Sequence, residues 1–171
     1  LSTVTGLAFD SSGNLFESDF GSGQIFKFTP DGAKSAYVHG NVQLTGLAFD
    51  NAGNLFVGDA LNKSIYKIYP NLSVTTVASG LKLPLGLAFD NGGDLFFSEI
   101  QGNDIKEISS AGAQSTFASG AFVPYGIAFE PQAVPECSTL SLFSFGLCAL
   151  LVWRHRSYFR AWFNGSAATT T

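Results

Sequence analysis

Hydrophobic and polar positions follow the same pattern three times along residues 5–124. Each repeat opens with a short apolar run, Gly-Leu-Ala-Phe, followed by Asp, and passes through a glycine-containing turn into Leu-Phe. After a polar loop, apolar and polar residues alternate, as over 24–28, and a second turn leads to a fourth short stretch, as over 35–38. Short runs bounded by turn residues are typical of strands. The pattern predicts four strands in each repeat and an all-β fold.

The repeat has a period of 40 residues and needs no gap. We expect the recurring Phe to pack between repeats and the recurring Asp to accept a hydrogen bond from the backbone two residues further on. The equivalent positions are Gly6, Gly46, Gly86 and Gly126; Phe9, Phe49, Phe89 and Phe129; and Asp10, Asp50, Asp90 and Glu130. Four strands in about 40 residues match one blade of a β-propeller. The expected fold is therefore a partial β-propeller with blades at 5–44, 45–84 and 85–124, and one extra first strand at 125–130.

A resemblance to known families rests on the repeated Gly-Leu-Ala-Phe-Asp, the following Gly-Asn-Leu-Phe, and Asn-Lys-Ser-Ile-Tyr-Lys-Ile at 62–68. In these motifs residues 1–130 resemble NHL repeats and the related blades of SMP-30/gluconolactonase-like and streptogramin-lyase-like propellers. The resemblance implies the fold and leaves the activity open, because such blades serve many functions.

Three blades form an arc with two open edges, which favour further strand pairing. The chain begins at Leu1 and contains no Met. We therefore expect an N-terminal extension that carries further blades and a secretion signal. The alternative is that two chains close one symmetric six-bladed ring.

Charge is unevenly distributed along the chain. Residues 1–131 hold twelve Asp and Glu, six Lys and no Arg, whereas residues 132–171 hold one Glu and three Arg. Nucleic-acid binding depends on Lys and Arg contacts to phosphate. We therefore expect no nucleic-acid partner for this acidic body.

The composition changes after residue 130. Residues 131–136 read as a linker, and an uncharged apolar run covers 137–153. As a helix these 17 residues would be about 25 Å long, at the short end for a membrane crossing. Basic residues in the flank would stay on the cytoplasmic side, namely Arg154, Arg156 and Arg160. The expected organisation is a membrane or sorting helix with its basic flank at 137–160, and a disordered tail at 161–171.

This tail resembles a PEP-CTERM sorting signal of Gram-negative bacteria. The motif Val134-Pro135-Glu136-Cys137 precedes Ser-Thr-Leu, the apolar run and the Arg cluster, with Cys137 in place of a second Pro. The resemblance implies export, anchoring in the inner membrane, cleavage by an exosortase-like enzyme, and a final place at the cell surface or in the extracellular matrix. Two alternatives are a plain C-terminal membrane anchor and a buried core helix.

Candidate ligand-binding residues sit at two kinds of position. Asp19, Asp59 and Glu99 end the second strand of each blade. In the metal-dependent lactonase relatives, acidic side chains meet at the central channel, so these three could bind Ca²⁺ or Mg²⁺ through oxygen. The alternative is that each accepts backbone hydrogen bonds in its own loop. Loops that enter the first strands could face a ligand through Leu44, Pro84 and Tyr125.

The sequence contains no nucleophile motif, zinc-spaced His/Cys cluster or phosphate-binding loop. We therefore expect a non-enzymatic extracellular binding or scaffold protein without a cofactor, whose partner is a polysaccharide, a protein or a small ligand. The alternative is a fragment of a metal-dependent lactonase- or lyase-like enzyme, and a third interpretation is a degenerate gene remnant.

Overall fold

The computed structural model describes residues 3–40, 43–120 and 124–129. Contacts between residues divide the chain after Gln132, and the described residues all belong to the first unit. The predicted linker, sorting motif at 134–137, membrane helix at 137–160 with its three arginines, and tail at 161–171 lie outside the described residues. Within residues 3–129, where described, no helix is long and apolar enough to cross a membrane.

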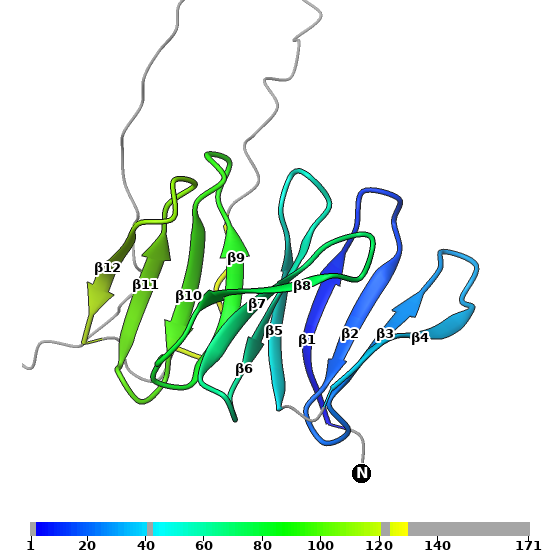
Figure 1. Cartoon of the computed structure of the whole chain (residues 1–171), viewed down its shortest axis with the longest axis horizontal. Helices are drawn as coiled ribbons and strands as arrows, with labels where there is room; N and C mark the ends of the chain where they lie inside the picture. The colour runs from blue at the N-terminus through cyan, green and yellow to red at the C-terminus, as the bar shows by residue number, and fades with distance from the viewer. Residues whose placement is uncertain (1–2, 41–42, 121–123, 130–171) are drawn as a thin grey trace, which may run out of the picture. The chain divides into compact units, whose positions relative to one another are not determined.

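Each repeat forms one four-stranded antiparallel sheet in chain order, which confirms the all-β prediction (Figure 1). The first blade contains β1 (Val4–Phe9), β2 (Leu15–Asp19), β3 (Gln24–Phe28) and β4 (Lys34–His39). The second contains β5 (Leu44–Phe49), β6 (Leu55–Asp59), β7 (Ser64–Ile68) and β8 (Val74–Ala78). The third contains β9 (Pro84–Phe89), β10 (Leu95–Glu99), β11 (Asp104–Ile108) and β12 (Gln114–Ser119).

The extra strand expected at 125–130 is not a strand in the described residues 124–129. A first strand in this fold pairs with the second strand of its own blade, and no such partner follows among the described residues. The segment nevertheless lies where a fourth first strand would lie, since Gly126 and Ile127 lie next to Gly86 of β9.

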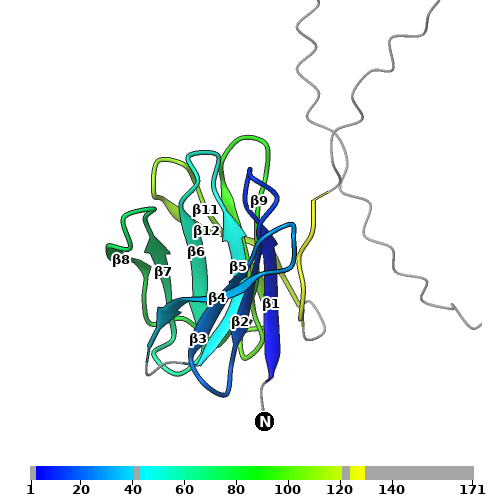
Figure 2. The ribbon, with the colours of Figure 1, turned by 90° about the vertical axis from the view of Figure 1, so that its right-hand side faces the viewer.

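The first strands of successive blades run side by side, β1 next to β5 and β5 next to β9 (Figures 1 and 2). The recurring glycine makes this approach possible, because a Cβ atom there would meet the backbone of the next blade. A Cβ on Gly6 would lie 2.9 Å from the nitrogen of Leu47, and one on Gly46 would lie 2.9 Å from the nitrogen of Leu87. Only glycine therefore fits where the blades converge.

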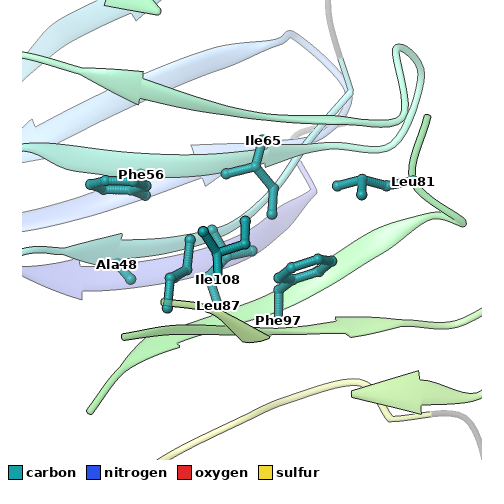
Figure 3. Close-up of a cluster of buried hydrophobic side chains, with 8 residues drawn as sticks. Ala48, Phe56, Ile65, Leu81, Leu87, Phe97 and Ile108 are labelled. Carbon is teal, nitrogen blue, oxygen red and sulfur yellow. The ribbon is translucent and has the colours of Figure 1, made fainter. Parts of the chain in front are cut away.

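Aromatic and aliphatic side chains fill the space between blades. In the cluster between the second and third blades, Phe56 and Ile65 come from one sheet and Leu87, Phe97 and Ile108 from the other (Figure 3). Recurring phenylalanines pack edge to face across each junction, which confirms the predicted packing between blades except for Phe9, which is 67% exposed. Their ring centroids are separated by 5.0 Å for Phe16 and Phe49, 4.8 Å for Phe56 and Phe89, and 4.9 Å for Phe96 and Phe129. Such a pair contributes about 0.5–1.5 kcal/mol beyond burial.

The first blade presents an apolar face that its counterparts bury. Leu7 in β1 is 59% exposed, whereas the equivalent Leu47 in β5 is 4% exposed. Val4 and Phe9 of β1 are also exposed. The difference arises because Leu47 packs against the preceding blade, and no described residues cover β1 in that way.

Candidate functional site

The first strands and residues 125–127 line a hollow with a volume of about 480 Å³, which we call the inner hollow. It lies where the first strands converge, on the side that would face the central channel of a propeller. Its wall consists mainly of glycine backbone and small or apolar side chains, from Val4–Leu7, Thr45–Leu47, Leu85–Leu87 and Tyr125–Ile127. A wall of this kind can contact a ligand through apolar surface and accept hydrogen bonds through backbone carbonyl groups.

Threonine hydroxyls beside the inner hollow tie each blade to the next. Thr5 Oγ1 donates to the carbonyl oxygen of Leu44 at 2.8 Å, and Thr45 Oγ1 donates to that of Pro84 at 2.9 Å. The third repeat has Leu85 at this position and so has no hydroxyl to repeat the bond. Sequence reasoning missed these ties, although the spacing of 40 between Thr5 and Thr45 carries the signal.

These ties bear on the loop residues expected to face a ligand. Leu44 is 3% exposed and Pro84 is less than 2% exposed. Both side chains are buried, in contrast to the expectation that they face a ligand. Tyr125 is 71% exposed and borders the inner hollow. Of the three expected residues, Tyr125 alone presents its side chain on the surface.

The acidic residues that end the second strands accept hydrogen bonds in their own blades. Asp59 Oδ1 accepts from the backbone nitrogens of Leu61 at 2.9 Å and Asn62 at 3.1 Å, and Oδ2 accepts from Asn62 Nδ2 at 2.7 Å. Asp19 Oδ1 accepts from the nitrogens of Thr3 at 3.1 Å and Gly21 at 2.9 Å. Both carboxylates are buried, and each closes the loop that follows its strand.

Glu99 departs from this arrangement because its side chain is one carbon longer. Its Oε1 accepts from the nitrogen of Lys82 at 2.8 Å, in the loop that enters β9. In the described parts of the chain, no group of three or more His, Cys, Asp or Glu side chains is placed to hold a metal ion. The bonds of Asp59, and that of Asp19 with Gly21, match the alternative interpretation of backbone bonds in the same loop, whereas the Glu99 bond goes to the loop that enters β9.

The recurring Asp at the end of the first strand holds the next turn, as predicted. Asp50 Oδ1 accepts from the nitrogens of Ala52 at 3.0 Å and Asn54 at 2.8 Å, while Gly53 takes a φ of 79°. Partial burial acts to raise the pKa of Asp50. Hydrogen bonds from Asn54 and the ammonium group of Lys67, 3.2 Å away, outweigh that effect, so the pKa lies below its ordinary value.

A second hollow, which we call the inter-blade groove, lies between the second and third blades and has a volume of about 420 Å³. Phe56, Val77, Phe89 and Ile108 supply apolar surface, and the remaining lining comes mostly from turns. Asp50 and Lys67 form the ion pair that gives the groove a charged border. Sequence reasoning did not identify this groove.

Comparisons with known proteins place the fold. No family model matches the chain, and no curated protein matches it closely enough to be a relative. Among solved structures, virginiamycin B lyase from Staphylococcus aureus is 21% identical with a TM-score of 0.64, over 73% of this chain and 45% of that chain. A chain of the nidogen/laminin complex is 20% identical with a TM-score of 0.69, over 75% of this chain and 53% of that one.

A gluconolactonase from Xanthomonas campestris is 15% identical, with a TM-score of 0.64, over 69% of this chain and 48% of that chain. The chain thus spans about half the length of the solved structures that it matches. Identities this low bear on the fold alone. The described residues therefore form three blades of a β-propeller, structurally similar to streptogramin-lyase-like and gluconolactonase-like proteins.

Proposed function

We propose that this chain is a non-enzymatic binding or scaffold module, displayed outside the cell. The observation that supports this proposal is the hydrogen bonding of the buried acidic side chains. Asp19 and Asp59 are buried and direct their oxygens to backbone nitrogens of their own blades. Carboxylates engaged in this way hold loops in place, and the adjoining inner hollow offers backbone and apolar surface.

The partner of such a module would be a polysaccharide, a protein or a small ligand at the inner hollow. Tyr125 is the exposed aromatic side chain at its border. Aromatic rings with a polar end are favoured at binding surfaces because they contribute large contact areas at a low entropic cost. We expect Tyr125→Ala to weaken binding in a glycan or protein array. Leu72→Ala, at an exposed apolar position that does not line the hollow, provides the control.

A second candidate function is that of a metal-dependent lactonase- or lyase-like enzyme. The structural similarity to virginiamycin B lyase and to a gluconolactonase favours it. A cation that binds only the folded state raises the free energy of unfolding, by about 2.7 kcal/mol at a hundred times its Kd. We would therefore measure Tm with and without millimolar Ca²⁺ or Mg²⁺ for the full chain and for Asp59→Asn. A Tm increase that Asp59→Asn abolishes would favour the enzyme, and no increase would favour the binding module.

Display at the envelope rests on the resemblance of the C-terminal segment to a sorting signal. Intact mass of the native protein from membrane and from medium tests it. We expect a membrane form that retains Cys137 and the arginines, and a released form that ends near Glu136. An uncut tail in both fractions would indicate a plain membrane anchor instead.

The same mass measurement tests how the exposed face of β1 is covered. Val4, Leu7 and Phe9 present apolar surface where Leu47 and Phe49 meet a preceding blade. Further blades upstream would give a mass well above 18.1 kDa. A mass near 18 kDa together with a dimer in solution would support the ring made of two chains.

A further inference from the structure

The outermost strand of each blade carries a β-bulge at an equivalent position. The strand register shifts between Ile25 and Phe26 in the first blade, between Ile65 and Tyr66 in the second, and between Ile105 and Lys106 in the third. The extra residues on the bulged strands are Tyr37, Val77 and Phe117. A bulge changes the direction of a side chain, so one side chain per blade is directed differently from its neighbours.

In the first and third blades the bulge residue is aromatic and packs on the phenylalanine of the second strand. The Tyr37 and Phe16 ring centroids are 4.9 Å apart with an interplanar angle of 85°. The Phe117 and Phe96 centroids are 5.0 Å apart at 87°. Two blades thus place an aromatic ring in the same position with the same edge-to-face geometry.

In the second blade the bulge residue is Val77, which has no ring to offer to Phe56. The inter-blade groove lies at this position, since both Val77 and Phe56 line it. Phe89 and Ile108 of the third blade line the same groove. The groove therefore borders the Phe56 ring on the side where the other blades place Tyr37 or Phe117.

The inter-blade groove has a polar border beside this apolar surface. In the first blade, burial raises the pKa of the Tyr37 hydroxyl, and the negative charge of Asp10 raises it further. Asp50 is the equivalent of Asp10 in the second blade and borders the groove, where it pairs with Lys67. The groove thus combines an apolar floor beside Phe56 with a carboxylate and an ammonium group at its border.

We propose that the inter-blade groove binds a small molecule that carries a phenol ring. The ring takes the place that Tyr37 fills in the first blade, edge to face with Phe56. Its hydroxyl group lies at the Asp50–Lys67 pair, where it can donate to the carboxylate or accept from the ammonium group. This site lies on a different surface from the inner hollow and is independent of the function proposed above.

The probe for the test is p-cresol, which is a tyrosine side chain without its backbone. We would titrate it into the full chain by NMR and follow ring-current shifts of the Val77 methyl groups. A fragment of this size is expected to bind with a Kd on the order of 1 mM. Toluene lacks the hydroxyl group, and we expect it to bind about tenfold more weakly, because it cannot form the hydrogen bond to the Asp50–Lys67 pair.

Two exchanges at the bulge position make the test specific. Val77→Tyr places the ring in the groove, so p-cresol should lose its site and its affinity should fall by about tenfold or more. Tyr37→Val removes the ring from the first blade, so a second p-cresol should bind beside Phe16. Since Tyr37→Val also removes buried aromatic surface, its fold is checked by circular dichroism, and Val77→Tyr alone decides the outcome if that fold is lost. Saturable binding lost in Val77→Tyr supports the proposal. Absence of binding to the wild-type chain, or equal binding to Val77→Tyr, overturns it.

Discussion

The close approach of the first strands makes Gly46→Ala the most informative substitution in the chain. A Cβ atom on Gly46 would lie 2.9 Å from the backbone nitrogen of Leu87 and closer still to the carbonyl oxygen of Leu85. Real Cβ atoms essentially never come within 3.0 Å of a heavy atom outside their own residue and its chain neighbours. Both contacts are to backbone, which cannot rotate away as a side chain can. The alanine therefore forces β5 and β9 apart.

The cost of this separation follows from what the junction contains. Overpacking a well-filled interior costs about 1–3 kcal/mol, and rigid neighbours place this case at the upper end. Replacing glycine by alanine also restricts the unfolded chain, which returns about 0.4–1 kcal/mol. We therefore expect Gly46→Ala to lower the free energy of unfolding by about 2 kcal/mol. With an m-value of about 2 kcal/mol/M, the urea midpoint should fall by about 1 M.

The assay is urea unfolding of the full chain followed by circular dichroism in the β-sheet band. The repeat itself provides a matched control, because Gly126 has the equivalent position and a Cβ on it would meet nothing within 4 Å. Gly126→Ala should leave the midpoint unchanged or raise it slightly. If Gly46→Ala unfolds at the wild-type urea concentration, the blades do not converge as closely as described, and the explanation of the recurring glycine fails.

Two further predictions concern the junction and the turns. Thr45→Val keeps the shape of a buried side chain but removes the hydroxyl that donates to the Pro84 carbonyl at 2.9 Å. The free energy of unfolding should therefore fall by about 1–3 kcal/mol in the same urea assay. An unchanged midpoint would mean that this hydrogen bond does not stabilise the junction between blades. The pKa of Asp50 is lowered in the folded state, so its contribution to stability is complete above about pH 4 and is lost as pH falls through the folded pKa. Between about pH 4 and lower pH, the Tm of Asp50→Asn should therefore fall less steeply than that of the wild-type chain. Equal slopes would contradict a lowered pKa for Asp50.

The sequence predicted the blades because each blade is specified locally. Short apolar or alternating runs define the strands, and a turn glycine such as Gly53 with the preceding Asp50 defines where the first strand ends. These features depend on residues within a few positions of one another. The repeat of 40 residues also predicted that recurring phenylalanines pack between blades, and the structure shows which rings pair.

The candidate site was less predictable because it depends on neighbouring blades. Leu44 and Pro84 looked like exposed loop residues, but they begin strands whose carbonyls receive hydroxyls from the preceding blade. The inter-blade groove depends on a bulge that shifts Val77 out of simple alternation. Alternation of apolar and polar residues does not predict a bulge. The missing ring at Val77 is recognised only when this residue is compared with Tyr37, its equivalent in the first blade.

Because the junctions between blades are alike, such a chain can evolve by gaining or losing whole blades. Each junction uses the same positions, a glycine at the convergence of first strands and a phenylalanine pair between blades. Deleting residues 45–84 would bring Phe16 against Phe89 in place of Phe49 and would preserve both contacts. In-frame duplication or loss of a 40-residue unit is therefore sterically neutral at the junctions. Gene rearrangement could change the length of the array in whole blades, and the groove beside Val77 would be gained or lost with its own unit.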